Sequence, residues 1–458
     1  MSNLSNDSFP GPTSATSTSP ELRHWQRRIF ASVWITYFAF YLCRYNMPVA
    51  IKWLGGVFDW KEDRLGIILS ALTVMYAVGQ FVNGQLADRF GARRIASLGI
   101  IGSVAMNLAV FAIVFWADAE TVNATIVLWG LAIFWGANGF FQSMGWTPMV
   151  RVMAHWFEIE RRGSVMGWLG TCYQFGGAAA TLLAFFLTGY YVKELSGDWR
   201  AVFWVPAGLF ALVGVYFHWS IRNGPEDVGL PPVNVEHTDA TRESPQKARP
   251  SIAANALRTV SNPYIWIVAL SFFMLDVNRY GFVNWLPKYL DQAGLNLENA
   301  TVFGHIKEAM KLCILPLAGS LGAVVAGWAT DRFFGGRRAP VMAVLLLALG
   351  LLSIIFPFLD TNNTPLIIAV VALIGFCTYG PHILMVGHAA QDFGKKSGAA
   401  GAAGFIDGMG YIGASLAGLG AGWMIVAHGY KETFVVFGFA AILGAVFAAV
   451  IWRVKPSS

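Results

Sequence analysis

The sequence predicts an all-α polytopic membrane protein with twelve transmembrane helices in two six-helix halves. Three observations support this fold class. Only 13% of the 458 residues are charged, whereas soluble domains carry about 25%. Apolar runs of about 20 residues, enough to cross a ~30 Å hydrocarbon core, recur along the chain. One long polar stretch, "RNGPEDVGLPPVNVEHTDATRESPQKARP", divides these runs six from six.

The expected domains follow from these runs. Residues 1–28 are rich in Ser, Thr and Pro and lack an apolar core, which predicts a disordered cytoplasmic tail and no signal peptide. We expect an N-terminal half at 29–220, a cytoplasmic linker at 221–263, a C-terminal half at 264–452 and a short tail at 453–458. The expected spans are 29–52, 66–86, 95–116, 124–147, 163–190, 200–220, 264–289, 305–328, 340–358, 365–388, 400–427 and 432–452.

The positive residues predict the orientation in the membrane. Of the 32 Lys and Arg residues, 21 fall in even-numbered connections and the two tails, and nine in odd-numbered connections. Positive charge favours the cytoplasmic side, so both termini should be cytoplasmic, in the cytoplasmic (inner) membrane. Topology thereby explains the net charge of +6, and we expect no nucleic acid partner. The four cysteines lie in apolar runs without metal-ligand spacing, so we expect no metal.

An internal repeat supports the division into halves. "GQLADRFGARR" follows the second expected span, and "GWATDRFFGGRR" follows the eighth. Such loops can hold neighbouring helix ends together in one conformation and release them in another, which predicts a gate. The alternative is a pair of solvated, positively charged loops. The matching residues, 243 positions apart, are Asp88 with Asp331 and Arg89 with Arg332.

A single arginine, Arg44, lies in the middle of the first expected span, in "YLCRYN". A charge at this depth costs roughly 2.5–3.5 kcal/mol on insertion scales, which indicates a functional role. The repeat supplies a counterpart, Arg279 in "NRYG" of the seventh expected span. Repeats of this kind bind substrate where the halves meet. Two arginines there repel each other, and each suits a phosphate or carboxylate group.

Arg279 also has an alternative partner within the protein. Asp276 precedes it by three residues, so the two side chains can pair on one helix face. No comparable acid lies within one turn of Arg44 in the sequence.

Four segments resemble a known family. "YLCRYN", "NGFFQSMGWTPMVRVMAHWF", "RYGFVNWLPKYL" and "YGPHILMVGHAAQDFGKKSGAAGAAGFIDGMGYIGAS" are similar to the major facilitator superfamily. Within it they resemble the organophosphate:phosphate antiporter family, over about residues 29–450. The resemblance implies the major facilitator fold and exchange of a phosphate ester for inorganic phosphate by rocking of the halves. It also implies that Arg44 and Arg279 grip the phosphate. The tyrosines that it implies as cavity-lining are Tyr37, Tyr41, Tyr76, Tyr379 and Tyr411.

The chain departs from the glycerol-phosphate carriers of that family at four cavity positions. Gln80 stands in place of a lysine, and Tyr173 in place of a histidine. Asp276 stands in place of a tyrosine, and Asp407 in "GFIDGMG" adds a second acid. The alternative for Asp407 is a partner for a polar group on a neighbouring helix. Charge counting favours a phosphodiester, a phosphonate or a zwitterion with an amine near an aspartate over a doubly charged monoester.

These features predict a non-enzymatic secondary active transporter of a small phosphorylated or phosphonate organic anion. We expect it to exchange this anion for inorganic phosphate, without a cofactor, as a monomer in the lipid bilayer. Two alternatives stay open. One is proton symport of an organic anion through Asp276 or Asp407. The other is a membrane sensor that binds a sugar phosphate without net transport.

Overall fold

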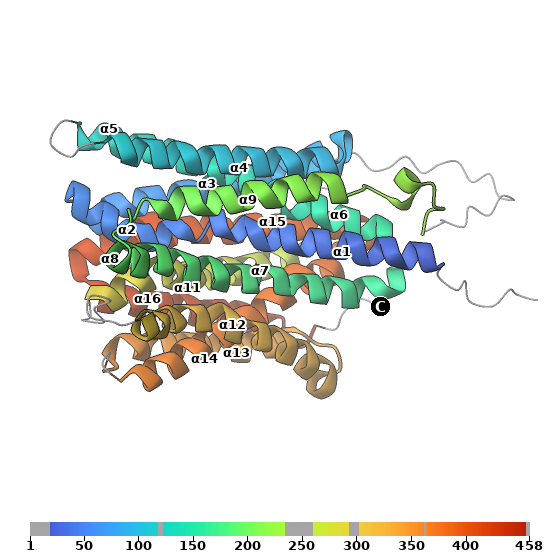
Figure 1. The fold of residues 1–458 in the computed structure, drawn as a ribbon. Helices are drawn as coiled ribbons and strands as arrows, with labels where there is room; N and C mark the ends of the chain where they lie inside the picture. The colour runs from blue at the N-terminus through green and yellow to red at the C-terminus, as the bar shows by residue number, and fades with distance from the viewer. Residues whose placement is uncertain (1–18, 118–121, 234–259, 293–301, 361–362, 455–458) are drawn as a thin grey trace, which may run out of the picture.

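The computed structural model describes residues 19–117, 122–233, 260–292, 302–360 and 363–454. Almost all of these residues are helical, and the long helices run side by side along one axis (Figure 1). Such a bundle satisfies every backbone hydrogen bond within each helix, which is what lipid requires of a spanning segment.

The helices follow the order that the apolar runs predict. The first part of the chain forms α1 (Pro20–Phe40), α2 (Asn46–Phe58), α3 (Glu62–Phe90), α4 (Ala92–Trp116), α5 (Ala124–Gln142), α6 (Trp146–Trp156), α7 (Ile159–Thr188), the short α8 (Tyr190–Glu194) and α9 (Ala201–Ser220). The second part forms α11 (Pro263–Gln292), α12 (Val302–Phe334), α13 (Ala339–Ile355), α14 (Thr364–Ile383), α15 (Ala390–His428) and α16 (Tyr430–Val450). Shorter turns are η1 (Tyr41–Cys43), η2 (Pro225–Val228), η4 (Phe356–Phe358) and the π-helical η5 (Leu384–Ala389).

Ten stretches of the described residues are long and apolar enough to cross a membrane. They correspond to the third to the twelfth expected spans. The first expected span is broken into α1, η1 and α2, and the second is α3, which carries polar side chains such as Gln80 and Asn83.

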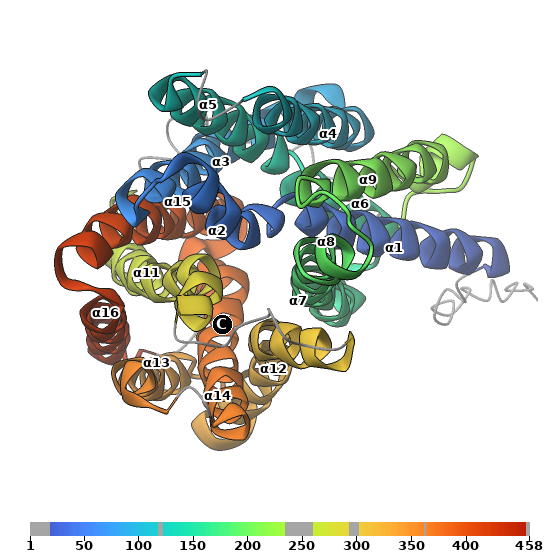
Figure 2. The same cartoon turned by 60° about the vertical axis from the view of Figure 1, so that its left-hand side comes forward.

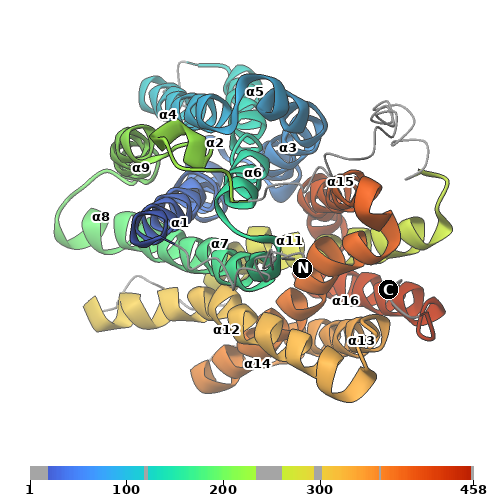
Figure 3. The same ribbon diagram turned by 90° about the vertical axis from the view of Figure 1, so that its right-hand side faces the viewer.

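The helices pack as two groups that meet along a central seam. Within the first group α3 packs on α5 and α4 on α9, and within the second α12 packs on α14 and α13 on α16. Across the seam α3 packs on α15, α7 on α12 and α2 on α11. Figure 2 and Figure 3 show the bundle from nearly opposite ends, with α4, α5 and α9 at the top of both views and α12, α13 and α14 at the bottom.

The internal repeat is also present in the packing. Gly139 of α5 lies so close to the Leu72 carbonyl oxygen of α3 that a Cβ would overlap it. Gly375 of α14 lies equally close to the Leu315 carbonyl oxygen of α12. Leu72 and Leu315 are 243 residues apart, the offset of the Asp–Arg loops. In both groups a small residue thus allows the second and fourth helices to approach closely, as membrane helices often do.

An asparagine on the first helix of each group completes this similarity. Asn46 Nδ2 donates to the Val202 carbonyl of α9 and to Asn107 Oδ1 of α4, both at 3.0 Å. Asn278 Nδ2 donates to the Phe437 carbonyl of α16 at 2.9 Å and to Ser353 Oγ of α13 at 2.8 Å. Each bond pair joins the first, third and sixth helices of its group. These buried amides anchor the helices that carry the two central arginines.

Three expectations about segment boundaries were wrong. The predicted tail at 1–28 ends too late, because α1 begins at Pro20; residues 1–18 lie outside the described residues. Ser19 caps this helix by accepting a hydrogen bond from the Leu22 amide, and proline suits the first helical position. The buried Gln26 then donates to the Trp156 carbonyl at 2.8 Å, which fixes the early turns.

The other two errors concern helices expected to be continuous. The first expected span breaks at residues 41–45, and the fourth breaks at 143–145 before α6 extends it to Trp156. The expected linker at 221–263 includes η2, and its residues 234–259 lie outside the described part of the chain, as do 455–458 of the expected C-terminal tail.

Candidate functional site

Arg44 lies at the break between α1 and α2. After the turn η1, Arg44 has φ −124° and ψ −43°, outside the helical region, and α2 begins two residues later. The break frees carbonyl oxygens that a continuous helix would use. Gln142 Nε2 donates to the Phe40 carbonyl at 3.1 Å, and Asn138 Nδ2 to the Cys43 carbonyl at 2.9 Å. Interrupted backbone is tolerated at membrane depth only where the protein supplies such partners.

The Arg44 side chain is 4% exposed and is held by neutral groups. Its Nε donates to Gln142 Oε1 at 3.1 Å. Its guanidinium carbon lies 4.8 Å from the ring centre of Tyr41 and 4.7 Å from that of Tyr76, which is within cation–π range. Among the described residues, Nη2 has no hydrogen-bond partner and no carboxylate forms an ion pair with Arg44. The positive charge is therefore oriented but not neutralised by these residues.

A chain of amides and hydroxyls behind Arg44 fixes Gln142 itself. Gln142 Nε2 also donates to Ser103 Oγ at 2.8 Å, and Ser103 Oγ donates to Asn138 Oδ1 at 2.7 Å. Asn107 Nδ2 donates to the Ser103 carbonyl at 2.9 Å. All four side chains are buried. Networks of this kind are rigid when their members are satisfied, so Arg44 is held in a defined direction.

Arg279 occupies the middle of α11 and is 5% exposed. Its Nη1 lies 3.3 Å from Oδ1 of Asp276, which is 1% exposed. The expected pairing of these two residues is therefore present. The guanidinium carbon lies 5.1 Å from the ring centres of both Tyr280 and Tyr379. Within the described residues, Arg279 Nε and Asp276 Oδ2 have no hydrogen-bond partner, so this pair retains a free donor and a free acceptor.

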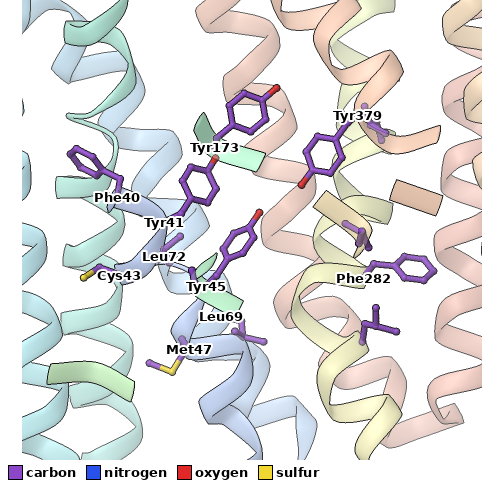
Figure 4. Close-up of a cluster of buried hydrophobic side chains, with 14 of the residues drawn as sticks. Phe40, Tyr41, Cys43, Tyr45, Met47, Leu69, Leu72, Tyr173, Phe282 and Tyr379 are labelled. Carbon is purple, nitrogen blue, oxygen red and sulfur yellow. The ribbon is translucent and has the colours of Figure 1, made fainter. Parts of the chain in front are cut away.

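Aromatic rings from both groups surround the two arginines. Figure 4 shows Tyr41, Tyr45 and Tyr173 on one side of the seam with Tyr379 opposite them. Ring centres are 6.3 Å apart for Tyr41–Tyr173 and 6.4 Å for Tyr173–Tyr379. Tyr76 and Tyr411 stack across the seam at 4.2 Å. Two further rings belong to this cluster: Tyr37, 4.9 Å from Trp146 by ring centres, and His382, 6.1 Å from Tyr173.

Two further predicted residues lie at the edge of this cluster. Asp407, half-buried on α15, is close enough to Asp276 and to both arginines to interact with them electrostatically. Gln80, half-buried on α3, accepts a hydrogen bond from Thr147 of α6 at 3.3 Å. The structure thus places Gln80 against α6.

The predicted gate stays a prediction. The side chains of Asp88, Arg89 and Asp331 lie outside the described side chains, and Arg332 is exposed near the end of α12.

The opposite end of the bundle, where α2 leads into α3, has ion pairs that the sequence did not predict. Lys288 Nζ of α11 lies 3.1 Å from Glu62 Oε1 of α3, and Lys52 Nζ of α2 lies 2.5 Å from Asp291 Oδ1. Tyr430 also donates to Glu62, at 3.1 Å. Each contact joins the two groups of helices, so this end is closed.

Sequence reasoning missed several residues of the centre. Gln142 and Asn138 lie within the quoted "NGFFQSMGWTP", and Tyr45 lies within "YLCRYN". The sequence therefore did contain a signal: two amide side chains within an apolar segment, and an aromatic residue next to Arg44. A single sequence could not show that these amides satisfy a broken helix on another part of the chain.

Two six-helix groups with a buried, charged centre on their seam define a membrane carrier. The sequence profile of the Major Facilitator Superfamily matches residues 33–418 and 309–458, so the chain belongs to this family. It is therefore a multi-pass membrane protein of a transporter family and not an enzyme. The predicted fold class of twelve transmembrane helices is confirmed.

Three relatives match this chain over most of their length. The glycerol-3-phosphate transporter of Bacillus subtilis (strain 168) is 30% identical, over 93% of this chain and 92% of its own length. The membrane sensor protein UhpC of Escherichia coli (strain K12) is 27% identical, over 92% and 91%. A probable hexose phosphate transport protein of Chlamydia muridarum is also 27% identical, over 96% and 95%. The resemblance to the organophosphate:phosphate antiporter family is thereby confirmed.

Solved structures share the fold at low identity. A bacterial homologue of the human lysosomal transporter Spinster, solved in an inward-facing and unoccupied conformation, has a TM-score of 0.73 at 14% identity. The match covers 94% of this chain and 97% of that one. The xylose transporter XylE from E. coli, in a partially occluded inward-open conformation, has a TM-score of 0.67 at 12% identity, over 94% and 98%.

Proposed function

We propose that this protein is a secondary active transporter of a small phosphorylated or phosphonate organic anion. It carries this anion across the cytoplasmic (inner) membrane in exchange for inorganic phosphate, by alternating access. The observation that carries the proposal is the pair Arg44 and Arg279, buried on opposite groups of helices, each with an N–H group that lacks a partner among the described residues. The names of the relatives, glycerol-3-phosphate and hexose phosphate carriers, support a phosphate ester as cargo.

The two arginines give the anion a role in the movement of the halves. Without an anion, Arg44 has no carboxylate partner among the described residues, and Asp276 offsets part of the repulsion between the two arginines through its ion pair with Arg279. A phosphate group between them replaces repulsion with two charge-assisted attractions. Bound anion thereby draws the halves together, an attraction that the empty carrier lacks. This difference couples movement to a loaded site, which is what exchange requires.

The ion pairs at the α2–α3 end determine what must change when the carrier opens at that end during transport. Lys288–Glu62 and Lys52–Asp291 join the halves there, and the distribution of Lys and Arg orients this end to the outside, with both termini cytoplasmic. The structure then corresponds to a carrier closed to the outside. The opposite state requires these pairs to break, and phosphate binding at the centre offsets part of that cost.

Counterflow in proteoliposomes tests the proposal. Vesicles loaded with unlabelled phosphate should take up radiolabelled phosphate without a pH gradient. Arg44→Ala and Arg279→Ala should each weaken phosphate binding by roughly 30-fold or more, because each truncation removes a buried charge partner worth about 2–5 kcal/mol. Arg64→Ala, at an exposed position outside the site, is the matched control. A ligand screen in which only carboxylates stabilise the purified protein would overturn the phosphate assignment.

Proton symport is a second candidate, because Asp276 Oδ2 is buried and lacks a partner within the described residues. A symporter would accumulate anion in phosphate-free vesicles under an inward proton gradient, whereas an exchanger would not.

A sensor is a third candidate, because one relative is the membrane sensor protein UhpC. A sensor would bind phosphate esters in a thermal-shift assay and give no counterflow. Gel filtration in detergent with light scattering tests the expectation of a monomer.

A further inference from the structure

The central site contains two carboxylates besides its two arginines. Asp276 pairs with Arg279, and Asp407 interacts electrostatically with Asp276 and with both arginines. With all four groups ionised, their charges cancel. A doubly negative phosphate ester would then bring an uncompensated charge into a buried site, which is costly. A positive group on the substrate would offset one of these negative charges.

The helix geometry brings the two carboxylates to one place. Tyr280 follows Asp276 by four residues on α11, and Tyr411 follows Asp407 by four on α15, so each pair shares a helix face. The rings of Tyr280 and Tyr411 are 5.9 Å apart. Because α11 and α15 are the seventh and eleventh spans, they run in the same direction. One helical turn before the two tyrosines, Asp276 and Asp407 therefore lie on the same side of this contact.

The contact between these helices supports the same placement. A Cβ on Gly410 of α15 would lie 2.8 Å from Asp276 Oδ2. This oxygen therefore points from α11 toward α15, the helix of Asp407. Among the described residues it accepts no hydrogen bond, although it is fully buried. A buried carboxylate oxygen without a donor is expensive, and a cation from the substrate would supply the donor.

The aromatic rings next to the acids also favour a cation. The Tyr280 ring lies 5.1 Å from the Arg279 guanidinium, and the stacked Tyr76–Tyr411 pair lies beside Arg44. Ring faces attract ammonium groups, most strongly where water is excluded. The site thus combines free anion-binding N–H groups with carboxylates and rings suited to an amine.

We propose, on the basis of the function proposed above, that the substrate is a zwitterion: a phosphate or phosphonate that carries a protonated amine. Its anionic group binds between Arg44 and Arg279, and its ammonium group binds at Asp276 and Asp407. Because Asp276 Oδ1 lies 3.3 Å from Arg279 Nη1, a short spacer connects the two charged groups.

Matched pairs of compounds test this proposal. Phosphoethanolamine is compared with ethyl phosphate, and 2-aminoethylphosphonate with ethylphosphonate, as competitors of phosphate counterflow by the full-length protein. We expect each amine to compete at about tenfold lower concentration than its amine-free partner, the effect of one hydrogen bond between charged groups. Equal potency within both pairs would overturn the proposal.

Variants assign the preference to the carboxylates. Asp276→Asn should bring the ratio of potencies within each pair close to one, whatever transport rate remains, and Asp276→Glu should restore part of it. Asp407→Asn provides a second, independent variant should Asp276→Asn fail to fold. Asp198→Asn, in an ion pair with Arg200 away from the centre, is the matched control and should keep the full preference. A preference that survives both asparagine changes at the centre contradicts the assignment.

The readout separates this inference from the proposed function. If phosphate counterflow occurs but the amines have no advantage, the zwitterion is wrong and exchange stands. If counterflow is absent, exchange is wrong, and thermal shifts with the same compound pairs still measure the preference. Uptake that follows a proton gradient, with equal potency within each pair, assigns the carboxylates to proton transfer and overturns the zwitterion.

Discussion

Gln142 offers the sharpest test of how the protein holds its central charge. Gln142→Ala removes the bond to Arg44 Nε at 3.1 Å and the bond to the Phe40 carbonyl at 3.1 Å. Bonds to charged groups contribute roughly 1.5–3 kcal/mol, and a buried carbonyl left without a donor costs about 1–3 kcal/mol. The first loss should weaken phosphate binding by roughly 10- to 100-fold, because Arg44 loses its orientation. The second should lower the melting temperature.

Two further variants separate orientation from general damage. Gln142→Glu places a carboxylate beside Arg44 and competes with the substrate, so it should weaken phosphate binding more than Gln142→Ala. Gln174→Ala is the matched control, because Gln174 is also buried on the seam but accepts its hydrogen bond from Ser320, at 2.8 Å. Phosphate affinity, from isothermal titration, and melting temperature are measured together. If both Gln142 variants bind phosphate within about twofold of the unchanged protein, Gln142 does not position Arg44.

The remaining predictions concern the closed end and the helix packing. Glu62→Gln removes the ion pair between Glu62, 13% exposed, and Lys288, 11% exposed. We expect the equilibrium between the two states to shift by about 1–3 kcal/mol toward the state that is open at this end. Distances between spin labels at that end should lengthen in a larger fraction of molecules, and an unchanged distribution would show that the pair does not hold the end closed. Gly139→Ala should destabilise the protein, because the added Cβ overlaps a backbone carbonyl, whereas Gly208→Ala meets nothing within 4 Å and should not. Equal melting temperatures for these two variants would contradict the packing argument.

The spans and the two central arginines could be predicted because each leaves a pattern that is visible in a single sequence. Hydropathy marks each lipid crossing, and the 243-residue repeat relates one half to the other. The break at Arg44 has one signal, which we did not use: Pro48 has no N–H to bond the Arg44 carbonyl four residues earlier. The amides that satisfy the broken backbone, such as Asn138 and Gln142, come from α5 and could not be assigned from the sequence.

The closed end could not be predicted for a different reason. Glu62 and Lys288 are 226 residues apart, and their contact exists only while the halves meet at that end. In the sequence, a pair that forms in one state and breaks in another appears only as two charged residues near helix ends. Charged residues are common there, so nothing indicates that the two pair. The same holds for Gln80, whose place against α6 depends on the break before Trp146.

The repeat makes Arg44 and Arg279 equivalent, but their positive charges are neutralised to different degrees. This difference orients a substrate in the site. Arg44 is oriented by an amide and two rings, so its full charge is available to an anion. Arg279 shares its charge with Asp276. An anionic group therefore gains more from Arg44, and a positive group on the same molecule gains most beside Asp276. Replacing the carboxylate should move the anion toward a central position between the arginines. Phosphate alone should then bind Asp276→Asn more tightly than the unchanged protein, while the amine loses its advantage.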